Sequence, residues 1–174
     1  MYCVVDPSSG NNRLVKQVQW LKPAEGWLKL NPDDSVCNSS GLARCGGLLR
    51  DSKGHWIMGC VKSTYANSSI VAELLALREE LSLCVEWDCH AAEIELDASA
   101  AISLVASNVN SYGDLSGLVD DCRELLLRLP QAKLSHCFRE ANFCVDVVAK
   151  MGSASSDMSL VFVSTTPPPS HCYR

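Results

Sequence analysis

The sequence predicts an α/β domain in which helices pack against a mixed sheet, with elements in the order βββαβααβα. Two features predict it. Three strand-like segments joined by short turns come first, and short connections favour antiparallel neighbours. A long amphipathic helical segment follows, after which strand-like and helical segments alternate toward the C-terminus.

Turn-forming residues delimit the first three strands. Residues 27–30 (WLKL) are the first predicted strand, which we expect to end in the Asn-Pro-Asp-Asp-Ser sequence that follows. Residues 42–50 and 55–62 are the second and third strands, and the Asp-Ser-Lys-Gly sequence between them favours a turn. The three segments therefore predict an antiparallel meander.

A helix over residues 69–87 is predicted by apolar residues at steps of three and four. These residues are Ile70, Leu74, Leu77, Leu81, Cys84 and Val85. Ser68 or Ser69 can cap the start of this helix. Glu73 projects onto the edge of the apolar stripe, where an unpaired carboxylate costs several kcal/mol. Arg78 or Lys62 could pair with it, and a role in a site is the alternative.

The rest of the chain continues the alternation of strands and helices. The predicted strands are residues 91–96 and 133–138, and the predicted helices are residues 97–107, 115–129 and 139–151. We expect one domain over residues 20–152. Residues 1–19 are expected to be a linker or the remnant of a larger protein, and residues 153–174 a Ser/Pro-rich tail that favours an extended conformation.

The composition is that of an ordinary globular protein, with 47% apolar and 20% charged residues. No apolar run is long enough to span a membrane, and the N-terminus lacks the pattern of a secretory signal. We therefore expect an intracellular monomer without membrane contact; the sequence does not distinguish nucleus from cytoplasm. The net charge of −5 argues against tight binding of nucleic acid by the domain alone.

The ten cysteines are predicted to be reduced and structural. No two of them form a C-x2-C pair, and only four histidines are scattered among them, so the pattern does not fit a zinc ribbon or finger. Several lie inside apolar segments, where a free thiol behaves as a small hydrophobic group.

Four acidic residues occupy positions that solvation alone explains poorly: Asp33 after the first strand, Glu73 beside the core stripe, Asp97 after the fourth strand, and Asp146 in an otherwise apolar helix. Each has an alternative explanation, because Asp33 could serve a turn, Asp97 could cap a helix and Asp146 could be solvated. Four converging carboxylates would repel one another unless divalent cations neutralised them. Oxygen ligands of this kind suit Mg²⁺ or Mn²⁺.

The sequence resembles the ribonuclease H fold, and more narrowly the plant ribonuclease H-like domains related to retroelement reverse transcriptases. The resemblance covers residues 20–152 and is carried by ordered motifs: KLNPDDS, GGLLRDSKGHW, AELLALREEL, IELDASAA and HCFREANFCVDVVAK. It implies a five-stranded mixed sheet flanked by helices. It also implies an endonuclease that cleaves the RNA strand of RNA–DNA hybrids with two Mg²⁺ or Mn²⁺ ions.

By the same resemblance, Asp33, Glu73, Asp97 and Asp146 match the four catalytic, metal-binding carboxylates of the family. Asp33 and Asp97 would share both ions, whereas Glu73 and Asp146 would each hold one side. His136 stands ten residues before Asp146, where the family keeps a loop histidine that assists product release, although here it falls in a predicted strand.

Three departures from the family pattern bear on activity. Asp34 replaces the glycine of the first motif, and Pro32 removes a backbone N–H from a strand expected to be central. Residues 108–113 carry no Lys or Arg where a basic extension is expected. Two hypotheses follow: a metal-dependent ribonuclease H, or a non-catalytic, retroelement-derived module that binds nucleic acid or protein weakly.

Overall fold

The meander predicted from the turn sequences is present in the computed structural model, which describes residues 2–5, 15–18, 21–37, 41–107, 113–139 and 159–163. Its strands are β3 (Leu28–Cys37), β4 (Leu42–Arg50) and β5 (Trp56–Tyr65), and both pairings are antiparallel. The turn between β4 and β5 forms because the Asp51 carboxylate accepts hydrogen bonds from the backbone N–H groups of Lys53 and His55. Gly54 supplies the positive φ of +85°.

The first strand of the meander is longer than predicted. We expected it to end at residue 30, but β3 continues through the Asn-Pro-Asp-Asp segment and pairs with β4 along that whole length. Pro32 fits because the parallel partner on the other side of β3 pairs only with residues 28–30. No ladder hydrogen bond to that partner is lost at Pro32, so its position in this strand is tolerated.

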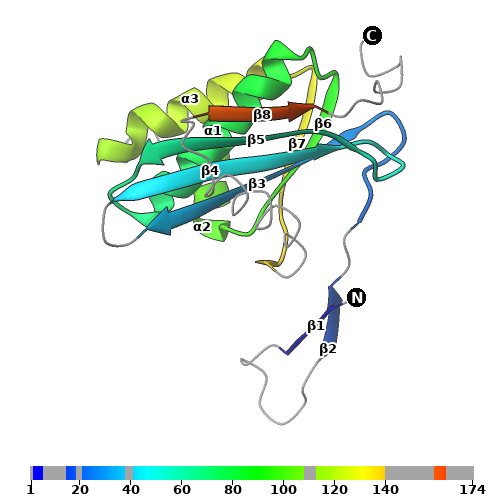
Figure 1. Cartoon of the computed structure of the whole chain (residues 1–174), viewed down its shortest axis with the longest axis horizontal. Coiled ribbons are helices and arrows are strands. Elements are labelled where there is room, and N and C mark those ends of the chain that lie inside the picture. The colour runs from blue at the N-terminus through cyan, green and yellow to red at the C-terminus, as the bar shows by residue number, and fades with distance from the viewer. Residues whose placement is uncertain are drawn as a thin grey trace.

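Two parallel strands extend the sheet on the β3 side. They are β6 (Ala91–Leu96), which pairs with β3, and β7 (Gln131–His136), which pairs with β6. The helices α1 (Ser69–Glu86), α2 (Ser99–Ala106) and α3 (Ser116–Arg128) lie together behind the sheet in Figure 1, with the 3-10 turn η1 (Gly113–Leu115) before α3. The order from β3 to β7 is the predicted one.

The apolar stripe predicted for the central helix faces the sheet. Leu74, Leu77, Leu81 and Cys84 are fully buried and join residues of β3, β6, α2 and α3 in one core. Of the two serines that could cap α1, Ser68 does so: its side chain accepts a hydrogen bond from the Val71 backbone N–H. The six cysteines whose burial is described are all free and buried.

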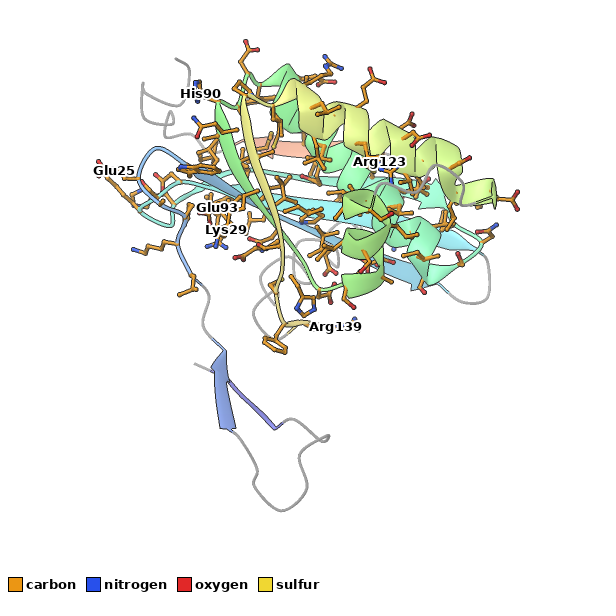
Figure 2. All side chains as sticks on the ribbon, turned by 180° about the vertical axis from the view of Figure 1, so that it is seen from behind. Glu25, Lys29, His90, Glu93, Arg123 and Arg139 are labelled. Atoms are coloured by element: carbon orange, nitrogen blue, oxygen red, sulfur yellow. The ribbon has the colours of Figure 1, made fainter. Side chains whose placement is uncertain are left out.

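Charged residues of this framework are also buried, as Lys29 is, or half-buried, as Arg123 is. Lys29, on the face of β3 opposite α1, pairs with Glu93 at 3.3 Å and Glu95 at 2.6 Å on β6, and Figure 2 shows Lys29 beside Glu93. Arg123 of α3 donates hydrogen bonds to the carbonyl oxygens of residues 104, 105 and 107. It thereby satisfies the backbone carbonyls that the end of α2 leaves open.

Segments outside the predicted domain also form strands. Residues 153–174 were assigned to an extended tail, but β8 (Ser159–Val163) pairs antiparallel with β5 and adds a sixth strand to the five expected. Within residues 1–19, β1 (Tyr2–Val5) and β2 (Val15–Val18) form a separate two-stranded sheet (Figure 1). The helix predicted over residues 139–151 lies outside the described residues, apart from Arg139. No helix in the described ranges is both long and apolar enough to cross a membrane.

Candidate active site

The parallel register of β3 and β6 brings two predicted site residues to the same level. Leu28 pairs with Ala92 and Leu30 with Ile94, and the same offset, counted beyond the last paired residues, matches Asp33 with Asp97. Asp97 directly follows β6, and the N-cap of α2 is Ala98, which makes no side-chain capping hydrogen bond. Asp33 lies inside a strand opposite Gly46 and is buried, so it does not form a turn.

Glu73 reaches the same region from α1. The two cations that could have neutralised it are engaged elsewhere, because Lys62 lies 2.6 Å and Arg78 2.9 Å from oxygens of Glu79. Arg78 also pairs with Asp121 at 3.5 Å. The neighbours of Glu73 are therefore other carboxylates, and the local ion pair with Lys62 or Arg78 does not form.

Asp34 is a further acidic residue of this region, which the sequence indicated only as a replacement of the glycine in the first family motif. Side chains alternate along β3, and Leu28 and Leu30 face α1, so Asp34 faces α1 as well. The Asp34 carboxyl group is hydrogen-bonded to that of Glu73. By the same alternation the Asp33 side chain leaves the opposite face of β3, and it acts on Glu73 only through its charge. We call Asp33, Asp34, Glu73 and Asp97 the carboxylate cluster.

The electrostatics of the carboxylate cluster show how closely its members interact. Burial, the charge of Asp34 and its hydrogen bond, and the charges of Asp97 and Asp33 together raise the pKa of Glu73 to about 9. Burial also raises the pKa of Asp34, whereas its hydrogen bond with Glu73 and the charge of Arg139 lower it. A hydrogen bond between two carboxyl groups requires that one of them be protonated, so the pair shares a proton.

The donor atoms of the cluster suit a hard divalent cation. The buried Glu73 Oε2 and Asp97 Oδ1 atoms have no hydrogen-bond partner among the described residues, which is costly unless a cation or water engages them. The donor set is all oxygen, the chemistry that Mg²⁺ and Mn²⁺ prefer. In the described part of the chain, no three Asp, Glu, His or Cys side chains are already arranged around one ion. The residues thus fit such an ion in chemistry, with Asp146 outside the described residues.

His136 and Arg139 border the cluster at the end of β7. The His136 ring lies with Nε2 3.2 Å from the Asp97 carbonyl oxygen and packs edge-on against Phe138. His136 is exposed and is the last residue of β7. It therefore lies in a strand, as predicted, and not in a loop. Figure 2 shows Arg139 just beyond the end of β7, on the side of the site where its charge reaches Asp34.

The field of the cluster extends to a neighbouring thiol. Burial raises the pKa of Cys137 to about 12, and the charges of Glu95, Asp97 and Asp33 contribute. The Cys137 backbone N–H donates to the carbonyl of Leu96 at 2.8 Å, which ties the end of β7 to the strand that carries Asp97. Acidic side chains are therefore concentrated where β3, α1 and the end of β6 meet.

Comparisons with known proteins agree with this architecture. Residues 31–152 match the model of the family described as Reverse transcriptase-like. A protein of Arabidopsis thaliana named "Putative ribonuclease H protein" is 30% identical over 137 residues, which are 79% of this chain and 22% of that protein. The chain thus spans about a fifth of the length of this relative.

Solved structures show the same fold. RNase H1 from the halophilic archaeon Halobacterium salinarum superposes with a TM-score of 0.67 at 19% identity, covering 74% of this chain and 98% of that one. LC11-RNase H1, solved in complex with an RNA/DNA hybrid, gives a TM-score of 0.63 at 18% identity and covers 74% and 99%. The predicted ribonuclease H-like fold, with its mixed five-stranded sheet and flanking helices, is confirmed by these matches.

Proposed function

Because the chain belongs to the Reverse transcriptase-like family, we propose that its domain is a divalent-metal-dependent endonuclease that cleaves the RNA strand of RNA–DNA hybrids. The observation that carries the proposal is the carboxylate cluster. Its members come from β3, α1 and the end of β6, and two of its buried oxygens lack a partner among the described residues. We place the activity in residues 20–152, extended by β8, with residues 1–19 as a leading segment.

Four carboxylates hold the reaction centre in this proposal. Asp33 and Asp97, level on neighbouring strands, would hold both of two Mg²⁺ or Mn²⁺ ions, and Glu73 and Asp146 would each hold one side. When bound, the ions supply activation of water and stabilisation of the charge that develops at the phosphate. The rigid strands orient the carboxylates, and their negative charge keeps a phosphate backbone away until cations are present.

Selectivity for the hybrid would come from its groove. A nuclease of this class reads 2′-hydroxyl groups across a shallow minor groove, and this chain, with a net charge of −5, would hold its substrate weakly. The Arg139 guanidinium is exposed beside the cluster, and its charge lowers the pKa of Asp34. A guanidinium in this position is suited to contact a phosphate.

A second candidate function is favoured by one observation. The Glu73 carboxyl is hydrogen-bonded to Asp34, so a group needed for an ion is engaged by a side chain that the family motif lacks. A retroelement-derived domain that kept its fold, but binds nucleic acid or protein without catalysing cleavage, does not need Glu73 as a metal ligand. In such a domain the contact between Glu73 and Asp34 would not impair function. Asp34 therefore separates the two candidates.

The test uses a hybrid with a labelled RNA strand, incubated with Mg²⁺ or Mn²⁺. We expect the wild type to cleave the RNA strand and Asp97→Asn to lose about a hundredfold or more, because loss of a metal ligand amounts to several kcal/mol in the transition state. Asp114→Asn, a change at an exposed aspartate of η1, is the matched control and should keep full activity.

Asp34→Gly extends the same test. Removing the carboxyl that engages Glu73 should raise metal-dependent cleavage above that of the wild type. If neither the wild type nor Asp34→Gly cleaves the hybrid, while both bind it equally, the nuclease proposal is wrong and the non-catalytic module stands. Equal cleavage by wild type and Asp97→Asn would indicate a contaminating nuclease and equally overturn the proposal.

A further inference from the structure

The C-terminal turn of α1 places two cysteines side by side. Asp88 has a φ of 50°, and its backbone N–H donates to the Val85 carbonyl at 3.2 Å. The Cys89 N–H donates to the Cys84 carbonyl at 2.9 Å. This pair of hydrogen bonds around a left-handed residue is the Schellman motif, in which the side chains at the ends of the longer loop commonly touch. Here those two side chains are Cys84 and Cys89.

The thiols of Cys84 and Cys89 contact each other. They are hydrogen-bonded, and the contact raises the pKa of Cys84 and lowers that of Cys89. Cys84 is fully buried, while Cys89, 3% exposed, lines a pocket of about 490 Å³ together with His90, Arg128 and Pro130. Cys89 therefore borders a pocket in the surface, and the Cys84 thiol that it contacts is buried.

Other buried cysteines of the helical face are engaged differently. The Cys45 thiol lies 3.8 Å from the Ala72 carbonyl oxygen and Cys122 lies 3.6 Å from the Leu74 carbonyl oxygen, both in hydrogen-bonding contact with the backbone of α1. Burial raises the pKa of both thiols to about 12. These thiols stay protonated and unreactive at neutral pH, because the thiolate is the nucleophile.

The cysteine pair is remote from the carboxylate cluster. It lies before the start of β6, next to His90, whereas Asp97 follows the end of that strand. Figure 2 shows His90 and Arg139 at opposite ends of β6 and β7. Chemistry at the pair is thus separate from that proposed for the cluster.

We propose that Cys84 and Cys89 form a redox-active dithiol that closes to an intrachain disulfide on reaction with a hydroperoxide. The Cys89 thiolate attacks one peroxide oxygen, the O–O bond breaks, and an alcohol or water leaves, so that Cys89 becomes a sulfenic acid. The Cys84 sulfur then attacks the Cys89 sulfur, the S–O bond breaks and water leaves. Two thiols are oxidised by two electrons, and one hydroperoxide is reduced.

The sequence around the pair gives a direct assay. Cleavage after glutamate cuts at Glu80, Glu86 and Glu93, so the two cysteines fall in separate peptides, residues 81–86 and 87–93. The folded full-length chain is treated with hydrogen peroxide, quenched in acid, alkylated and digested without reduction. We expect the two peptides to appear linked by mass spectrometry and to separate on reduction. We also expect roughly tenfold more oxidation at the pair than at Cys122, since susceptibility follows thiolate character and access.

Two variants control the assay. Cys89→Ser should abolish the linked peptide, and Cys122→Ser, which removes a buried thiol outside the pair, should leave it unchanged. Circular dichroism before and after peroxide shows that the fold is kept. Separate alkylated peptides from peroxide-treated, folded wild type would overturn the proposal, as would a Cys89 linked to any cysteine other than Cys84.

Discussion

Replacing Glu80 by glutamine should make the stability of the domain less dependent on pH. Glu80 lies on α1 with 2% of its surface exposed, and the Cys60 thiol donates a hydrogen bond to its Oε1 atom at 2.5 Å. Burial raises the pKa of Glu80 to about 8; the Cys60 hydrogen bond lowers it and the nearby charge of Glu79 raises it. Ionised Glu80 is therefore destabilising in the folded chain.

The sign and size of the effect follow from linkage. The carboxyl titrates at 4.5 in the reference state and at about 8 in the folded chain, so its contribution is fully present below 4.5 and is lost as the pH rises toward 8. At about 1.36 kcal/mol per pH unit, the difference corresponds to roughly 5 kcal/mol as an upper limit, which relaxation around the charge will reduce. Glutamine, neutral throughout, avoids this loss.

Urea unfolding of wild type and Glu80→Gln at about pH 5 and about pH 8.5 measures the effect. The stability of Glu80→Gln relative to wild type should rise between the two pH values by several kcal/mol at most. Glu86→Gln, at an exposed glutamate of the same helix, is the matched control and should show no such gain between the two pH values. A constant difference between wild type and Glu80→Gln would refute the reasoning.

Two further changes test packing that the structure makes specific. Gly47→Ala would drive a methyl group into the Glu80 carboxyl and should lower the free energy of unfolding by about 1–3 kcal/mol. Combining it with Glu80→Ala should recover part of that loss. Strictly additive effects of the two changes in denaturant titrations would contradict this contact. Arg123→Ala should lower stability by about 1–3 kcal/mol because it leaves carbonyls at the end of α2 unsatisfied. Arg128→Ala, at an exposed arginine of the same helix, should have little effect in thermal melts, and equal losses would argue against the capping role.

Periodicity predicted most of the fold because most elements obey local rules. The apolar stripe of α1 and the Asp-Ser-Lys-Gly turn needed no tertiary information, and both are present. The length of β3 could not be predicted in the same way. Its second half is a strand because β4 pairs with it through Cys37, and that pairing overrides the turn preference of the Asn-Pro-Asp-Asp sequence.

The candidate site was predictable in outline and not in detail. The order of the acids along the chain indicated Asp33, Glu73 and Asp97, but the contact between Asp34 and Glu73 depends on which face of β3 meets α1. The burial of Glu80 has a local signal in the sequence: Glu80 stands three residues after Leu77 and four before Cys84, within the apolar stripe. Spacing alone does not reveal that Gly47 makes room for it.

The strand β8 replaces β5 as the edge strand of the sheet. It covers the backbone of β5, and it then stands itself at the end of the sheet with the sequence SLVFV, which carries no charge. Val161 is 48% exposed there. The opposite end, β7, is polar and includes Lys133, a residue type that discourages unwanted strand addition. Self-association at high concentration should therefore begin at the C-terminal side of this molecule, where nothing in β8 repels a second extended chain.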